Sequence, residues 1–220
     1  SDLTSLTAIL FILYYLNHMT LFDALAHSFT TISTGGFSTH DNSFAYFQNT
    51  SLLNIAIIFM IFGSFPFLLL AQMSLTNISS LIRDNQIRLF LSILVLAIVS
   101  IYYFAQSYVD GNTLQKISTI SFNTISIISG TGYISSNFEK WGNYASVLFL
   151  LLMFIGGCAG STTGGLKVFR FQILFKFILL HLKKMLQPHI IMTAQFNGKK
   201  VTESTYESVV IFFFVYIFTF

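Results

Sequence analysis

The chain has 220 residues, of which 54% are hydrophobic and 9% charged, and its formal net charge is +3. Soluble domains carry about a quarter charged residues, so this composition excludes an ordinary water-soluble domain and favours an integral membrane protein. The small net charge argues against a nucleic-acid partner, and the single cysteine, Cys158, excludes an internal disulfide framework.

Five apolar tracts are expected to be membrane helices. They cover residues 3–16, 52–75, 87–105, 145–182 and 206–220. A helix needs about 20 residues to cross a bilayer, and the first and last tracts are shorter than that. We therefore expect the chain to be an interior piece of a longer membrane protein.

Two shorter segments, 21–33 and 114–129, lie between these tracts and are rich in Ser and Thr. Each leads into a glycine phrase, TGGF at 34–37 and GTGY at 130–133. Runs of this length are typical of interfacial, re-entrant or core helices. The chain therefore predicts the order span, short helix, glycine turn, span, and it does so twice.

Local signals support this repeated order. Residues 28–33 (SFTTIS) and 121–126 (SFNTIS) agree at five of six positions, which favours an internal duplication. Thr20, with Asp23 three residues later, is expected to cap the first short helix, and Asn112-Thr113 the second.

The placement of Lys and Arg predicts the orientation. Two basic residues lie in the connection after the second tract, and more lie at or after the end of the fourth: Arg83, Arg88, Lys176, Lys183, Lys184, Lys199 and Lys200. The opposite connections mix basic and acidic residues: Lys116, Lys140, Asp41, Asp110 and Glu139. The basic side should be cytoplasmic, so both glycine turns should be reached from outside.

The glycine turns are candidate ion-binding segments. Irregular backbone at membrane depth survives only where protein or a water-filled cavity surrounds it, and its carbonyl oxygens can replace the hydration shell of an ion. The expected filter for a monovalent cation comprises Thr34, Gly35, Gly36, Gly130, Thr131 and Gly132, with the following aromatic residue packed behind each turn. A tight turn that uses glycine only for its conformation is the simpler interpretation, but two copies favour the filter.

The fourth tract is too long for one span, because its residues would form a helix of about 57 Å at 1.5 Å per residue, nearly twice the hydrocarbon thickness. Five of the ten residues 156–165 are glycine. A broken helix with an intramembrane loop is expected, and a helical hairpin is the competing topology. A phosphate-binding loop is rejected, because Leu166 stands where that motif requires lysine.

Other polar residues give no sign of catalysis. Five histidines share no spacing: His18, His27, His40, His181 and His189. Asp23 and Asp41 are interpreted as a helix cap and an outer-vestibule residue. Lys167 and Arg170 fit either a gating role or the cytoplasmic edge of the second half-helix. No grouping of a nucleophile with a general base stands out, so we do not expect an enzyme.

The stretches DALAHSFTTISTGGFSTHD (23–41) and FIGGCAGSTTGGLKVFRFQ (154–172) closely resemble the Trk/Ktr potassium-uptake family, specifically its TrkH-type membrane subunit. The resemblance implies an all-α membrane protein in which four helix–pore-loop–helix repeats surround one potassium-channel-like pore. Residues 1–82 would be the second repeat, 83–187 the third with its broken second helix, and 188–220 a cytoplasmic connection and the start of the next.

The resemblance also implies roles for residues. Gly36 and Gly132 would lie at the ion constriction, one from each repeat. The broken helix would form a gate below the filter, and its residues are Gly156, Gly157, Gly160, Ser161, Thr162, Thr163, Gly164, Gly165, Lys167 and Arg170.

The function implied is potassium uptake, a form of monovalent-cation transport or symport, across the bacterial inner membrane. K⁺ would be the transported ion, with no cofactor. A homodimer and a cytoplasmic nucleotide-binding regulatory subunit of the TrkA type would be the protein partners. The alternative from the sequence itself is a secondary transporter with a midplane substrate site in its broken helices.

Overall fold

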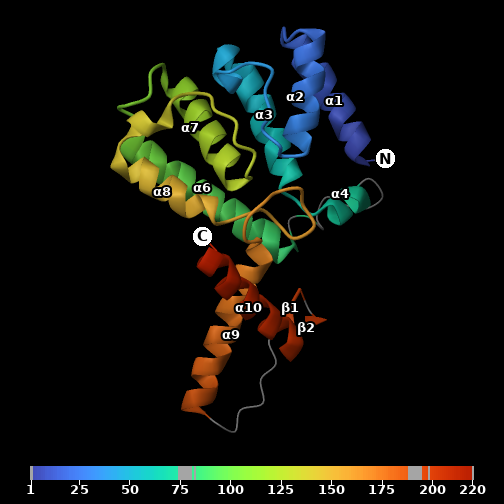
Figure 1. Ribbon diagram of the computed structural model, residues 1–220, viewed down its shortest axis with the longest axis vertical. Helices are drawn as coiled ribbons and strands as arrows, with labels where there is room; N and C mark the ends of the chain where they lie inside the picture. The colour runs from blue at the N-terminus through green and yellow to red at the C-terminus, as the bar shows by residue number, and fades with distance from the viewer. Residues whose placement is uncertain (1, 74–80, 82, 188–194, 198, 220) are drawn as a thin grey trace.

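The computed structural model describes residues 2–73, 81, 83–187, 195–197 and 199–219. Its helices are α1 (Asp2–Leu16), α2 (Leu21–Ile32), α3 (Thr50–Gly63), α4 (Phe67–Met73), α6 (Asn85–Ala105), α7 (Thr113–Ile128), α8 (Asn143–Met153), α9 (Val168–Leu186) and α10 (Glu203–Thr219). Helices α1 to α8 form an upper body, and α9 and α10 extend below it (Figure 1). The last two residues of the tract 52–75, the boundary residue 82 and most of the connection after 187 lie outside the described residues.

The expected order of elements occurs twice. Helices α1 and α2 are followed by a glycine turn, a 3₁₀ turn at Ser43–Tyr46 and helix α3. Helices α6 and α7 are followed by a glycine turn, a 3₁₀ turn at Phe138–Trp141 and helix α8. The all-helical fold class is thereby confirmed. In the described residues, the strands are β1 (Gln195–Phe196) and β2 (Lys199–Lys200), which pair antiparallel between α9 and α10.

Most of the apolar helices are too short to cross a bilayer. Among the described residues, α6 alone has the length and the mean hydropathy, 2.2, of a complete span. The tract 52–75 was expected to be one membrane helix, and that expectation was wrong in detail: α3 ends at Gly63 and α4 begins at Phe67. Pro66 lies in the gap, and proline has no N–H to continue the helix from α3.

The fourth tract breaks as predicted. Helix α8 ends at Met153, and α9 begins at Val168. The segment 154–167 between them is an irregular loop that lies under the upper body, and α9 leads away from α8 below it (Figure 1). The alternative helical hairpin was therefore wrong, because α9 does not return along α8.

Polar caps fix the start of both short helices. The Thr20 hydroxyl accepts a hydrogen bond from the Asp23 amide at 3.1 Å, as expected. Asn112 and Gln115 form a reciprocal capping box, which satisfies amides that have no partner inside the helix. Thr113 is the first helical residue and not a cap. Burial raises the pKa of Asp23, but hydrogen bonds from Thr39 and Thr20 and the nearby His40 outweigh that effect and lower it overall.

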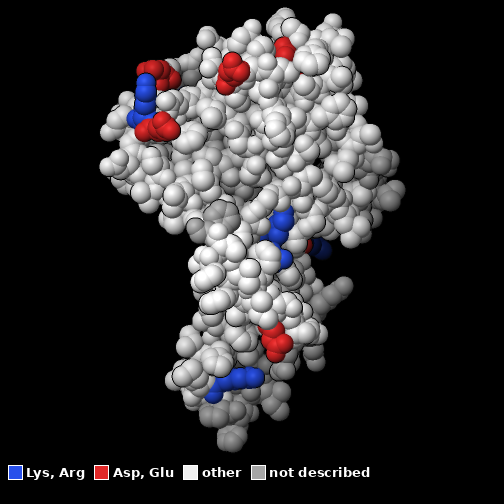
Figure 2. All heavy atoms as spheres, viewed as in Figure 1, with Lys and Arg blue, Asp and Glu red and all other residues white. Residues whose placement is uncertain are grey.

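The surface has the character of a protein in lipid. Figure 2 shows acidic side chains, with basic ones among them, near the upper end of one face, mainly basic side chains lower down, and a broad zone between them with almost no charge. Large apolar side chains on the helices are exposed, with Leu96 on α6 at 70% and Phe214 on α10 at 72%. Soluble proteins rarely expose such continuous apolar surface.

The capping box leads to a testable expectation for α7. Replacing Asn112 by Ala should cost about 1 kcal/mol of local helix stability, because the backbone amide of Gln115 loses the Asn112 side-chain oxygen that accepts from it. Asn112→Asp keeps an oxygen acceptor and serves as the control. Hydrogen exchange of the first-turn amides of α7 should be faster in Asn112→Ala than in the wild-type protein or the control. Equal exchange in the two variants would show that the cap contributes nothing.

Candidate functional site

The ends of α2 and α7 carry the two glycine turns in the same local geometry. The Thr30 hydroxyl donates to the carbonyl of Phe37 at 2.9 Å, and the Ser126 hydroxyl donates to the carbonyl of Tyr133 at 2.8 Å. In both cases the donor lies seven residues before the aromatic residue that follows the turn. The hydroxyl therefore ties each turn back to its own helix.

This equivalence corrects the alignment of SFTTIS with SFNTIS. That alignment pairs Thr30 with Asn123, whereas the hydrogen bonds pair Thr30 with Ser126. Helices α2 and α7 end at Ile32 and Ile128, and these two residues are as far apart in the sequence as Thr30 and Ser126. The sequence match was thus three residues, nearly one helical turn, out of register.

The two turns touch through their backbones. Gly36 has φ +69°, and a Cβ built on it would lie 1.7 Å from the carbonyl oxygen of Thr131. Gly132 has φ +85°, but its Cβ would meet no atom within 4 Å. Both positions need a left-handed backbone, which costs L-residues about 1–2 kcal/mol. Of the two positions, only that of Gly36 must also lack a side chain because the backbone of the neighbouring turn approaches it closely.

Tyr133 links the second turn to the first short helix. Its side chain is 1% exposed, and its hydroxyl lies 2.5 Å from Oγ1 of Thr30 and 3.2 Å from Oγ1 of Thr31. Thr31 in turn lies 3.0 Å from the hydroxyl of Tyr14 on α1. Tyr133 therefore packs behind the second turn as expected, and it does so against α2 of the first repeat.

Phe37 behaves differently. Its side chain is 77% exposed, so the expectation that it packs behind its own turn was wrong. The buried aromatic next to Tyr133 is instead Phe44, with ring centroids 4.6 Å apart. The amide of Ala45 donates to the carbonyl of Ile134 at 3.0 Å, so the segments that follow the two turns are also joined.

The loop 154–167 is ordered by its own backbone at both ends. The amide of Gly156 donates to the carbonyl of Leu166 at 2.8 Å, and the amide of Leu166 donates to the carbonyl of Phe154 at 3.1 Å. Inside the loop, the Thr163 hydroxyl accepts from the amide of Gly157 at 2.9 Å. These bonds join the two ends of the loop, which therefore forms a closed lobe between the end of α8 and the start of α9.

Thr162 connects this loop to the first glycine turn. Its hydroxyl lies 3.2 Å from the carbonyl of Ile32, the last residue of α2, and 3.1 Å from the carbonyl of Gly63, the last of α3. It also accepts from the Thr34 hydroxyl at 3.1 Å. A single side chain thus meets the end of the short helix, the start of the turn and the end of α3.

The loop also lies beside the second turn and the break in the second tract. A Cβ on Gly130 would lie 3.5 Å from the amide nitrogen of Gly164. The amide of Cys158 donates to the carbonyl of Ser64 at 2.9 Å, and the amide of Ala159 donates to Oε1 of Gln86 at 2.9 Å. Ser64 and Gln86 were not predicted from the sequence, although the SFP run at 64–66 indicates the helix break that exposes the Ser64 carbonyl.

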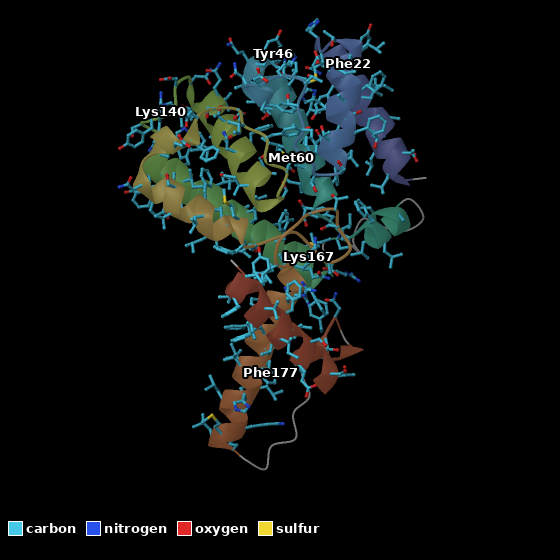
Figure 3. The ribbon with its side chains drawn as sticks, in the orientation of Figure 1. Phe22, Tyr46, Met60, Lys140, Lys167 and Phe177 are labelled. Carbon is cyan, nitrogen blue, oxygen red and sulfur yellow. The ribbon has the colours of Figure 1, made fainter. Side chains whose placement is uncertain are left out.

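The two cations that follow the loop have different surroundings. The Lys167 ammonium folds back and donates to the carbonyl and the hydroxyl of Thr163, and it lies where the upper body meets α9 (Figure 3). The Arg170 guanidinium lies 3.5 Å from the ring centroid of Phe212 on α10. The structure therefore joins Lys167 to the other predicted loop residues and directs Arg170 toward the next helix.

Among the residues that the structure describes, no three His, Cys, Asp or Glu side chains cluster as they would around a divalent metal ion. The polar groups gathered at the turns are backbone carbonyls and the hydroxyls of Thr and Ser. Neutral oxygens of this kind suit a weakly hydrated monovalent cation.

The chain is similar to bacterial potassium-uptake proteins. The family described as TrkH, cation transport protein, matches residues 3–220. The Trk system potassium uptake protein TrkI of Halomonas elongata is 33% identical over 207 residues, which are 94% of this chain and 42% of that protein. TrkH of Escherichia coli K12 is 34% identical over 206 residues, covering 92% of this chain and 42% of that protein.

A comparison of the fold with solved structures also gives a TrkH protein as a match. The crystal structure of the potassium transporter TrkH from Vibrio parahaemolyticus superposes with a TM-score of 0.86 and 31% identity, over 96% of this chain and 46% of that one. The chain therefore spans less than half the length of the relatives that it matches.

The Tyr133 contacts predict a measurable effect. Tyr133→Phe removes the hydroxyl that lies against Thr30 and Thr31 and should cost the full-length protein about 1 kcal/mol of unfolding free energy. The matched control is Tyr144→Phe, which removes an exposed hydroxyl 3.2 Å from Ser100. Thermal unfolding in detergent should show a lower midpoint for Tyr133→Phe alone, and equal midpoints would contradict the assigned role.

Proposed function

This chain belongs to the TrkH family of cation transport proteins, and on that premise we propose that the full-length protein takes up potassium through a pore whose filter includes both glycine turns. The observation that carries the proposal is the backbone contact between Gly36 and Thr131, beside a loop that is bonded to the first turn. The names of the relatives, which are potassium uptake proteins, support K⁺ as the ion.

In this proposal, the carbonyl oxygens of residues 34–36 and 130–132 replace part of the hydration shell of K⁺. The ends of α2 and α7 point toward the turns, and the partial negative charge at a helix C-terminus favours a cation there. The Tyr133 hydroxyl and the hydroxyls of Thr30 and Ser126 fix the turns from behind. The ion path itself would need the remaining repeats of the full-length protein.

The loop 156–165 would be the gate. Two features support this role: the loop lies next to both turns, and hydrogen bonds from its hydroxyl and backbone groups join it to the ends of α2 and α3. Opening would require the Thr162 hydroxyl to leave the carbonyls of Ile32 and Gly63. Lys167 would stabilise the closed lobe through Thr163, and Arg170 would act outside it, against α10.

The remaining proposals concern the setting. Residues 1–82 and 83–187 would be the second and third of four repeats, and the turns would face the outside of a bacterial inner membrane. The lower position of most of the basic residues supports this orientation (Figure 2). A homodimer and a cytoplasmic nucleotide-binding regulatory subunit remain proposals drawn from the family resemblance.

The filter is tested by a pair of alanine variants of the full-length protein. Gly36→Ala should lower the K⁺/Na⁺ permeability ratio strongly, because its methyl group displaces the Thr131 carbonyl. Gly132→Ala meets open space and carries only the left-handed strain, about 1–2 kcal/mol, so its effect should be smaller. Reversal potentials in proteoliposomes measure both, and wild-type ratios in both variants would refute the filter assignment.

The gate is tested at Thr162. Thr162→Val keeps the side-chain shape but removes the hydroxyl that meets Thr34, Ile32 and Gly63. The closed state should then lose about 1 kcal/mol of stability. Basal ⁸⁶Rb⁺ uptake should rise by about fivefold as a result. Thr124→Val is the control, because the buried Thr124 hydroxyl donates to Ile120 within its own helix. Equal basal uptake in the two variants would contradict a gating role for the loop.

A further inference from the structure

Residues 38–40, which leave the first glycine turn and are here called the outer arm, are tied to the start of α2. The Thr39 hydroxyl donates to Oδ1 of Asp23 at 2.6 Å, and Oγ of Ser38 lies 2.9 Å from Nε2 of His27. Asp23 and His27 are four residues apart, so they lie on one face of the helix. Two side chains of α2 therefore hold the outer arm.

His27 makes its two contacts as a neutral ring. Its Nδ1 lies 2.8 Å from the carbonyl oxygen of Asp23, which can only accept, so Nδ1 carries the ring proton. Nε2 then accepts from the Ser38 hydroxyl, and the Ser38 oxygen accepts from the amide of His40 at 3.2 Å. Both ring nitrogens of this fully buried histidine are thus satisfied without a charge.

His40 is not satisfied in this way. Its Nε2 is buried and lies 3.4 Å from Oδ1 of Asp23, but it makes no hydrogen bond with the residues that the structure describes. The ring stacks on that of Tyr46, with centroids 3.6 Å apart and planes 10° from parallel, which fixes it beside the carboxylate. A proton that gives this ring a positive charge would turn the contact into a charge-assisted hydrogen bond, about twice as strong as a neutral one.

The groups around His40 leave it as the one whose charge can change near neutral pH. In the described part of the chain, the ionisable groups that face it come from α2 and the 3₁₀ turn after the arm: Asp23, His27 and Tyr46. Asp41, the next residue, is exposed. Burial raises the pKa of Asp23, but hydrogen bonds from Thr39 and Thr20 outweigh that effect and lower it overall, so the carboxylate remains charged. An ordinary histidine changes its charge between about pH 5 and 8.

The second repeat builds the same tie from neutral groups. In the register that the hydrogen bonds of the two turns fix, Asn123 takes the place of His27. Its Nδ2 donates to the carbonyl of Thr119 at 2.9 Å and to Oγ of Ser135 at 2.7 Å. Thr119 itself stands where the first repeat has Asp23. An outer arm can therefore be held without any charge, so the charge of Asp23 is not needed for the tie alone.

We propose that His40 and Asp23 form a proton-binding site that stabilises the first glycine turn from its outer side. With the proton bound, the charged His40 ring donates to the Asp23 carboxylate and holds the outer arm against α2. When the proton leaves, the arm keeps the ties through Ser38 and Thr39 alone. The His40 side chain is 25% exposed, so protons can reach it from solvent.

The outer arm gives this site a route to the proposed filter. The arm begins two residues after Gly36, whose backbone approaches Thr131 of the second turn. A looser arm would allow the first turn to move away from the second and should weaken the discrimination between K⁺ and Na⁺. That effect rests on the function proposed above, whereas proton binding at His40 does not.

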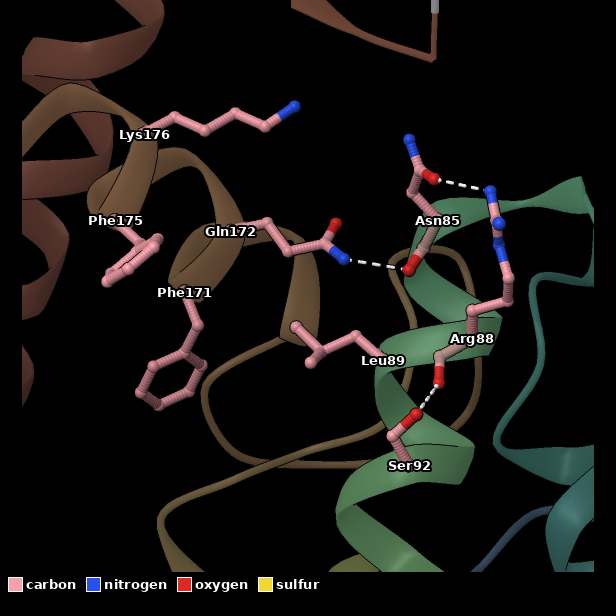
Figure 4. A pocket seen from close by; sticks show the side chains of 8 residues that line it. All are labelled: Asn85, Arg88, Leu89, Ser92, Phe171, Gln172, Phe175 and Lys176. Atoms are coloured by element: carbon pink, nitrogen blue, oxygen red, sulfur yellow. Dashed lines mark hydrogen bonds between the residues drawn. The ribbon is translucent and has the colours of Figure 1, made fainter. Parts of the chain in front are cut away.

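Hydrogen exchange of the full-length protein tests the proton site without any transport measurement. Protection factors of the amides of 38–41, corrected for the intrinsic effect of pH, should fall by about fivefold from about pH 5.5 to about pH 8. The reason is that the extra hydrogen bond is present below the ordinary titration range of histidine and is lost above it. The first turns of α9 are the internal reference: Gln172 donates there to the carbonyl of Asn85, and no histidine is among the described residues that line the cavity at that bond (Figure 4). Their protection should not change.

Two variants should remove the response, and one should keep it. His40→Gln cannot become charged and Asp23→Asn cannot pair with a charge, so the protection of the arm should be the same at both pH values. Asp41→Asn is the matched control, because it removes an exposed carboxylate from the next residue and should respond to pH as the wild-type protein does. A wild-type arm whose protection does not change with pH, or variants that keep the wild-type response, would overturn the proton site.

Reversal potentials in proteoliposomes test the link to the filter. Lowering the outer pH from about 8 to about 5.5 should raise the K⁺/Na⁺ permeability ratio of the wild-type protein by up to about fivefold and leave that of His40→Gln unchanged. A ratio that does not change with pH, in a protein whose arm does respond, would overturn the link to the filter. A protein that prefers K⁺ at neither pH would refute the proposed function, and the exchange experiment would still decide the proton site.

Discussion

The structure depends on one constraint: backbone groups outside helices need partners when water cannot reach them. Three segments of this chain leave the helix at the same place, namely the turns at 34–36 and 130–132 and the loop 154–167. They are satisfied largely by one another and by helix ends. Thr162 meets the carbonyls of Ile32 and Gly63, and the loop pairs Gly156 with Leu166. Each irregular segment is therefore stable because the others are present.

This mutual dependence ties the proposed filter to the proposed gate. The Thr34 hydroxyl, at the start of the first turn, donates to the same Thr162 that holds the loop. Across the repeats, Tyr133 fixes the second turn to the first short helix. A movement of α9 would pull on the loop at Val168, whose amide donates to the carbonyl of Gly157. In the proposed function, selectivity and opening thus share one set of hydrogen bonds.

Features with a local cause were predictable from the sequence. Glycine density predicted the break at 154–167, and the polar residues before each short helix predicted the caps at Thr20 and Asn112. Family resemblance supplied the gate residues. The register of the repeat was missed because Ser, Thr and Ile recur at several offsets, and only the hydrogen bonds of Thr30 and Ser126 fix it. Phe37 was misjudged and Gln86 was missed, because contacts with segments distant in the sequence decide the surroundings of both.

The proposed function requires that the two glycine turns face one ion path. A crystal structure of the full-length protein grown with Rb⁺ tests it most directly through anomalous scattering. An anomalous peak is expected within coordination distance of carbonyl oxygens from both 34–36 and 130–132. A peak that contacts only one of these segments, or Rb⁺ bound elsewhere with none between them, would contradict it.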